Sequence, residues 1–144
     1  MIIQNIYLPK YEWSIKVYYA VNGYYAEEIL KDLEKYNPTV AEYGSVKDLI
    51  ENYEYNTGFT ITDYEHKQSL VVIGLTTSPS EFQHTFDHEK GHLAIHIAKY
   101  YDISPYSEEY QYLAGDIGKR LFPIAQKFLC KHCKQELTLD LFSK

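Results

Sequence analysis

The alternation of apolar and polar residues predicts two strands at the start of the chain and two helices after them. Residues 2–8 and 14–21 are rich in β-branched and aromatic side chains, and Pro9 separates them. Residues 25–36 place apolar side chains at helical spacing with charged side chains opposite, and a shorter helix is expected over residues 46–53. We expect these four elements to form scaffold.

Two further strands are predicted over residues 59–62 and 70–76, joined by a polar turn. The second is a continuous apolar run, which is typical of a strand buried on both faces. The sequence therefore predicts an α+β fold, with a small antiparallel or mixed sheet, in a single domain that covers residues 1–144.

Two longer helices follow this sheet in the sequence. Ser78 can cap a helix and Glu81 stands three residues later, so a helix is predicted over roughly residues 79–101. Ser104 with the proline after it is expected to start another helix, which runs through Leu121 and beyond.

The first of these helices contains the pattern His-Glu-x-x-His, formed by His88, Glu89 and His92. Residues four apart lie on one face of a helix, so the two histidines can offer nitrogen atoms to one zinc ion. Glu89 would lie beside the metal, where a carboxylate takes a proton from zinc-bound water. This pattern is typical of zinc-dependent peptidases, whose substrates are peptides or proteins.

Histidines recur every four residues along this helix, as His84, His88, His92 and His96. Successive members rotate by about 40° and rise by about 6 Å, so all four cannot meet one ion. Only the pair His88 and His92 has a glutamate in the position that a zinc peptidase needs. His96 is expected nearer the core, either as an alternative ligand or as a residue packed behind the ligands.

A catalytic zinc ion usually has three protein ligands, so a third group must come from elsewhere. Glu109 borders the apolar face of the last helix, whereas Glu108 points nearly opposite that face and is expected to be solvated. Asp116, Tyr112 and Arg120 lie on the same side as Glu109. In one interpretation these residues orient a metal ligand and stabilise the oxyanion that forms during hydrolysis. In the other they form an exposed polar face.

The composition limits the kinds of molecule that the protein is expected to bind. The net charge of −6 argues against binding along a nucleic-acid backbone, and no segment approaches the roughly 20 apolar residues of a membrane span. The N-terminus does not look like a signal peptide, so a cytoplasmic protein is expected. Cys130 and Cys133 are expected to be reduced thiols, with a second metal or a dimer-bridging site as the alternative.

The motif and the segment after it resemble the small gluzincin-like metallopeptidases, including those encoded beside phage and mobile-element repressors. The likeness rests on residues 88–92 and on residues 109–114, which are similar to the Glu-Ala-x-x-Phe-Ala segment of that family, with Tyr110 where the family usually has alanine. The resemblance implies a zincin-like minimal domain, with zinc bound by His88, His92 and Glu109 and with Glu89 as general base. The alternative is a non-catalytic zinc-binding or protein-interaction domain of a mobile element.

Overall fold

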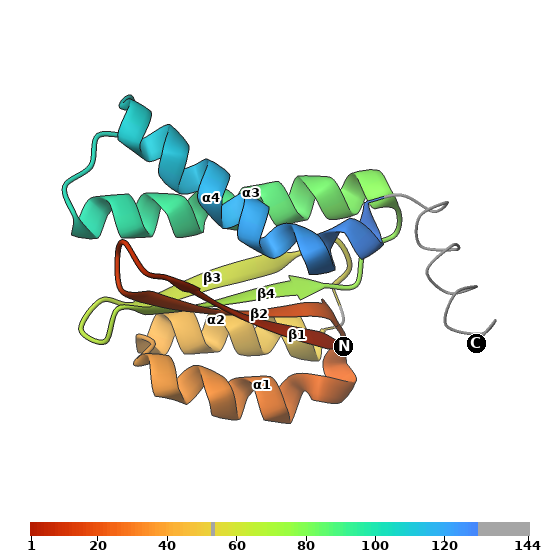
Figure 1. The fold of residues 1–144 in the computed structure, drawn as a ribbon. Helices are drawn as coiled ribbons and strands as arrows, with labels where there is room; N and C mark the ends of the chain where they lie inside the picture. Colours follow the sequence, from red (N-terminus) through yellow and green to blue (C-terminus); the bar gives the residue numbers. More distant parts are fainter. Residues whose placement is uncertain (53, 130–144) are drawn as a thin grey trace.

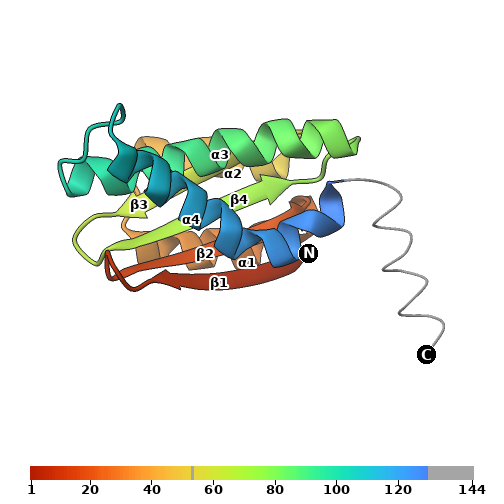
Figure 2. The ribbon, with the colours of Figure 1, turned by 45° about the horizontal axis from the view of Figure 1, so that its top comes forward.

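A computed structural model describes residues 1–52 and 54–129, and it shows a four-stranded sheet with helices on both faces (Figure 1). Helices α1 and α2 cover one face of the sheet, and α3 and α4 cover the other (Figures 1 and 2). In the described part of the chain, no helix combines the length and the apolar character needed to cross a membrane. In chain order the elements are β1 (Ile2–Leu8), β2 (Trp13–Val21), η1 (Gly23–Tyr25), α1 (Ala26–Leu33), η2 (Glu34–Tyr36), α2 (Val40–Glu51), β3 (Gly58–Asp63), β4 (Gln68–Gly74), α3 (Pro79–Tyr100), α4 (Glu108–Ala125) and η3 (Gln126–Phe128).

The sheet is mixed, with the strand order β1-β2-β4-β3. β1 pairs with β2 and β3 pairs with β4 in antiparallel hairpins, while β2 and β4 run parallel at the centre. Parallel neighbours need a long crossover connection, and here α1 and α2 lie within it. The four predicted strands and the α+β class are confirmed. The apolar run of β4 lies in the middle of the sheet and is buried on both faces, as expected.

Each face of the sheet has its own apolar core. The core under α3 and α4 is built around Trp13, Val17, Tyr19, Phe82, Leu93, Ile97, Leu113, Ile117 and Leu121. The core under α1 and α2 is built around Tyr18, Ile29, Leu33, Val46, Ile50, Leu70 and Val72. Because β2 and β4 supply side chains to both cores, they position the two helical layers relative to each other.

Helix boundaries differ from the prediction where a cap overrides the apolar pattern. α2 begins at Val40 because Thr39 and Glu42 form a reciprocal capping box, whereas the sequence predicted a start near residue 46. α4 begins at Glu108 because Ser107 is its cap, not at Ser104. Tyr53, the expected last residue of the second helix, lies outside the described residues.

A partly buried ion pair joins α1 to the sheet. Asp32 accepts hydrogen bonds from Tyr18 Oη at 2.6 Å and from Lys16 Nζ at 2.7 Å. Burial alone would raise the pKa of Asp32, but the hydrogen bonds from Lys16 and Tyr18 outweigh it, so this pKa lies below its usual value of 3.8. The carboxylate form therefore stabilises the contact between α1 and β2.

Replacing this carboxylate tests the contact. Asp32→Asn is expected to lower the free energy of unfolding by about 2 kcal/mol at pH 7, because it leaves Lys16 without its charged partner. A depressed pKa stabilises the fold above the unfolded-state value, so the difference from wild type should shrink as the pH falls below about 4. Urea denaturation across this pH range measures it, with Asp48→Asn on the exposed side of α2 as control. Equal losses in the two variants would contradict the prediction.

Candidate active site

The packing of α3 on the sheet decides where its histidines lie. The helix starts at the predicted cap, where Ser78 Oγ accepts a hydrogen bond from Glu81 N at 3.2 Å. Its buried face consists of Phe82, Thr85, Phe86, Glu89, Leu93, Ala94, Ile97 and Ala98. The His-Glu-x-x-His motif is therefore split, because Glu89 faces the sheet while His88 and His92 lie beside it and are exposed.

The two motif histidines converge. His88 Nε2 and His92 Nε2 lie 3.1 Å apart, with their ring centroids 4.7 Å apart and their planes nearly perpendicular. Two nitrogen ligands of a tetrahedral zinc ion, each at about 2.0–2.1 Å from the metal, are separated by about 3.3 Å. The spacing of this pair thus suits two ligands of one metal ion.

Glu89 is the most deeply buried carboxylate of α3, with 3% of its surface exposed. The Thr60 hydroxyl of β3 lies 3.3 Å from Glu89 Oε1 and 3.2 Å from the Glu89 carbonyl oxygen. Burial raises the pKa of Glu89 above 4.5, while His92, His88 and the Thr60 hydroxyl act in the opposite direction. A carboxylate with a raised pKa is a stronger base near neutral pH.

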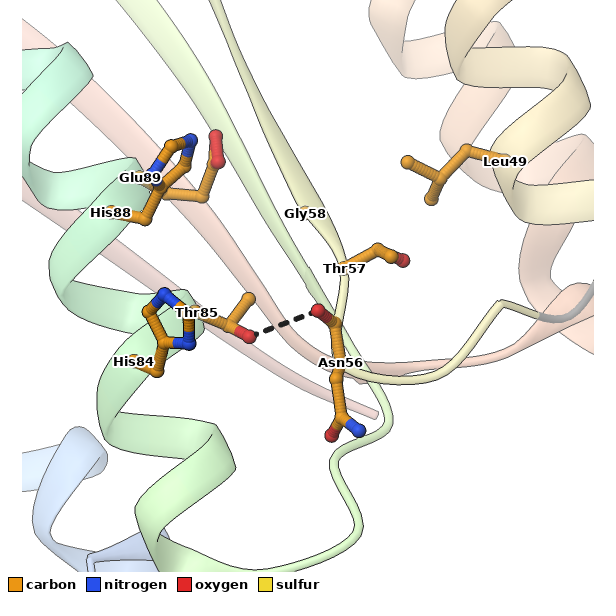
Figure 3. A pocket seen from close by; sticks show the side chains of 8 residues that line it. All are labelled: Leu49, Asn56, Thr57, Gly58, His84, Thr85, His88 and Glu89. Atoms are coloured by element: carbon orange, nitrogen blue, oxygen red, sulfur yellow. Dashed lines mark hydrogen bonds between the residues drawn. The ribbon is translucent and has the colours of Figure 1, made fainter.

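Gly58 permits this burial at the first residue of β3. A Cβ atom at this position would lie 2.6 Å from the carbonyl oxygen of Val72 and 3.0 Å from Glu89 Cγ. The stem of Glu89 therefore lies directly against the backbone of β3. Figure 3 shows Glu89 and His88 on the side of α3 that faces Gly58.

His96 is held on the sheet by a chain of hydrogen bonds. Its Nδ1 lies 2.8 Å from Thr62 Oγ1, Thr62 Oγ1 lies 2.8 Å from Ser69 Oγ, and Trp13 Nε1 donates to Ser69 Oγ at 3.0 Å. Burial, followed by the neighbouring His92, lowers the pKa of His96 and favours the neutral ring. His96 is more buried than His92, as the helical wheel predicted.

Glu109 is not brought to the histidine pair. It is exposed at the N-terminal end of α4, which rises away from α3 (Figure 1). α4 approaches α3 on the side of Lys90, since a Cβ at Gly118 would lie 3.4 Å from Lys90 Nζ, and Lys90 projects about 160° around the helix from both His88 and His92. In residues 1–52 and 54–129, no three His, Cys, Asp or Glu side chains are arranged to hold one metal ion.

The remaining candidates of the last helix lie over the opposite edge of the sheet. Arg120 donates hydrogen bonds to the Asp116 carboxylate at 2.9 Å and to the carbonyl oxygen of Tyr7 on β1. The motif, in contrast, lies over β3, at the other edge of the sheet. Tyr112 and Glu108 are exposed. The described contacts therefore favour the interpretation that Asp116, Tyr112 and Arg120 form an exposed polar face. Cys130 and Cys133 lie outside the described residues.

A cavity of about 320 Å³ opens beside the motif (Figure 3). It lies between α3, the end of α2 and the segment that leads into β3. Its lining consists of Leu49, Asn56, Thr57, Gly58, His84, Thr85, His88 and Glu89. A ligand in this cavity would touch both His88 and the buried base candidate.

Sequence reasoning missed Gly58 and Thr60, the two β3 residues that hold Glu89. Both belong to a predicted strand or its border, and no periodicity marks a strand residue that contacts a distant helix. Comparisons of the chain with known protein families, with curated proteins and with solved structures found no match.

Adding one methyl group at Gly58 tests the contact between β3 and α3. Gly58→Ala is expected to lower the free energy of unfolding by about 1–3 kcal/mol, because the strand or the Glu89 side chain must shift. Gly115→Ala is the control, since a Cβ there meets no atom within 4 Å and alanine favours the helix by about 0.5–1 kcal/mol. Chemical denaturation measures both. A Gly58→Ala protein as stable as wild type would contradict the described contact.

Proposed function

We propose that this protein is a zinc-dependent peptidase. The observation that supports this most is the pair of converging imidazole nitrogens, 3.1 Å apart, next to the buried carboxylate of Glu89. Two histidine ligands of one zinc ion with a carboxylate base beside them form the arrangement that activates water for attack on a peptide carbonyl. The cavity beside it offers room for part of a substrate.

His88 and His92 are the residues that would hold the metal. Their nitrogen donors and their spacing fit zinc, which prefers imidazole and thiolate ligands in tetrahedral sites. When bound there, zinc would polarise the carbonyl group of the substrate and lower the pKa of a water molecule. The third ligand implied by the family resemblance is Glu109, and it would reach the pair only if the start of α4 moved toward α3.

Glu89 is the general base in this proposal. Its carboxylate accepts a proton from the attacking water and later delivers that proton to the leaving amine. Burial keeps bulk water away from the carboxylate and raises its pKa, and the Thr60 hydroxyl restrains one of its oxygens. The contact with β3 at Gly58 holds the stem of Glu89, so the base is positioned before a substrate arrives.

The position of the site at a sheet edge supports an extended peptide as substrate. β3 is an edge strand, and its inner side pairs with β4. Edge strands bind extended peptides through backbone hydrogen bonds. A chain lying along this edge would pass below His88 and His92, with its carbonyl groups close to Glu89.

The second candidate is a non-catalytic zinc-binding or interaction domain. It is favoured by the position of Glu109, because the described residues gather only two of the three protein ligands of a catalytic zinc site. The two candidates make different predictions for a Glu89 substitution that leaves the histidines intact.

Zinc affinity tests the metal ligands. His88→Ala and His92→Ala are each expected to weaken zinc binding by about 100-fold or more, because each removes one of the two converging nitrogens. His84→Ala removes an exposed histidine of the same helix and should bind zinc like wild type. Competition with a chromophoric chelator, on protein without a histidine tag, measures the affinities. Zinc binding by the double variant that equals wild type would contradict the assignment.

The neighbouring glutamates of α4 form a matched pair for the third ligand. If Glu109 binds zinc, Glu109→Gln should weaken zinc binding while Glu108→Gln leaves it unchanged, since both are exposed in the structure. Equal affinities in the two variants would remove Glu109 from the ligand set.

Peptide hydrolysis tests the role of Glu89. Glu89→Gln is expected to lower the turnover of fluorescein-labelled casein by about 100-fold or more while zinc binding is kept, because the base is lost but the ligands remain. Asp87→Asn, which removes an exposed carboxylate two residues away, is the control. A zinc-bound Glu89→Gln protein as active as wild type, or a zinc-bound wild type with no hydrolysis, favours the non-catalytic domain.

A further inference from the structure

Helix α3 runs beside β3 in the same direction over the whole strand. Thr85 Oγ1 donates to the carbonyl oxygen of Asn56, just before the strand, and this bond is the dashed line in Figure 3. Near the other end of the strand, His96 Nδ1 lies 2.8 Å from Thr62 Oγ1, and Glu89 contacts β3 between these two points. His96 therefore lies beside the same edge strand as the motif, one helical turn beyond it.

The hydrogen-bond chain behind His96 determines which of its ring nitrogens carries the proton. Trp13 Nε1 donates to Ser69 Oγ, and Ser69 has no exposed surface, so the hydroxyl proton of Ser69 needs an acceptor within the protein. Among the described residues that acceptor is Thr62 Oγ1 at 2.8 Å. Thr62 then donates its own proton to His96 Nδ1. This arrangement gives each hydroxyl proton an acceptor, and it leaves the proton of the neutral imidazole on Nε2.

The Nε2 atom of His96 is a free donor at the surface. In residues 1–52 and 54–129 it has no hydrogen-bond partner, whereas each fully buried side-chain nitrogen or oxygen atom of the non-exposed residues has one. Nε2 is therefore accessible to solvent. Burial, followed by the neighbouring His92, lowers the pKa of His96, so the ring near neutral pH is uncharged and presents one N–H group.

The distance from the motif to His96 matches the repeat of an extended peptide. The ring centroids of His92 and His96 are 6.2 Å apart. Along a β-strand, carbonyl groups on the same side recur every second residue, at about 6.6 Å. A peptide beside β3 whose scissile carbonyl lies at the pair of His88 and His92 would thus bring the carbonyl two residues further along to His96.

We propose that His96 is a substrate-binding residue that donates its Nε2–H group to a backbone carbonyl of an extended peptide, two residues from the scissile bond. This inference rests on the proposed peptidase function. The bond recognises the main chain of the peptide and not a side chain. Thr62, Ser69 and Trp13 are positioning residues, because they fix the ring and its proton.

The first experiment reads the position of the proton. A long-range proton–nitrogen correlation spectrum of nitrogen-15-labelled protein distinguishes the two neutral forms of histidine, and the His96 signals are those that disappear in His96→Gln. Wild-type His96 is expected in the Nε2–H form alone. Thr62→Val removes the hydroxyl donor and should give a mixture of both forms, while Thr76→Val, just after β4, should keep the wild-type pattern. A wild-type ring with its proton on Nδ1 would overturn the proposal.

The second experiment reads peptide binding without turnover. N-acetyl-tetraalanine amide is titrated into zinc-loaded Glu89→Gln protein, and the NMR shifts of the β3 amide signals give the dissociation constant. Adding His96→Leu is expected to weaken binding by about 3–10-fold, because the donor is lost. His96→Gln supplies an amide N–H and a carbonyl acceptor and should restore most of the binding, which a purely structural role of the ring would not predict. Gln83→Leu, at an exposed position of α3, is the control.

The third experiment reads the same contact in turnover. In casein hydrolysis by otherwise wild-type protein, His96→Leu should raise KM by about 3–10-fold with kcat nearly unchanged, because the bond forms equally in the bound substrate and in the transition state. A lowered kcat with unchanged KM would overturn this role of His96.

The three measurements separate His96 from the peptidase. Casein hydrolysis together with tetraalanine binding that does not depend on His96 would overturn its role and leave the peptidase standing. Tetraalanine binding that depends on His96, with no hydrolysis of casein, would support the peptide contact and overturn the peptidase. No binding of the tetraalanine amide by the Glu89→Gln protein would also overturn the proposal. The proton position is measured on wild-type protein, so it tests the proposal even if His96→Leu does not fold.

Discussion

The close contact between α3 and the first residues of β3 is the constraint on which the site depends. Gly58 lets the stem of Glu89 lie against the strand backbone, and Thr60 bonds to both the carbonyl and the carboxyl group of Glu89. This contact fixes the rotation of α3 about its axis. With Glu89 turned toward β3, the helix geometry leaves His88 and His92 beside the strand with their Nε2 atoms together.

The arrangement of layers gives this contact its surroundings. The parallel pairing of β2 with β4 places α1 and α2 on the face opposite α3, and β3 then becomes the edge strand nearest the motif. Leu49 of α2 lines the cavity from the other helical layer. A site at an edge between two layers is open to an extended chain, which a site under the centre of the sheet would not be.

The polar groups around the proposed general base are largely hydrogen-bonded within the protein. Burial raises the pKa of Glu89, and the Thr60 hydroxyl is the hydrogen-bond partner of its carboxylate. Around it, the hydroxyl groups of Thr57 and Thr85 and the amide of Asn56 bond within the protein. Glu89, His84 and His88 are the ionisable groups among the described residues that line the cavity.

The sequence by itself determined the elements that local patterns encode: the four strands, the long helix capped by Ser78, and the position of His88 and His92 on one face of that helix. These follow from apolar period, capping and the four-residue repeat of a helix, all of which act within a few residues. It also predicted Glu109 as a ligand from its helical face, but helical periodicity does not set the distance between two helices. Only the tertiary structure decided that α4 starts away from the motif and that Gly58 and Thr60 hold Glu89, because those contacts join residues distant in the chain through packing that no local pattern records.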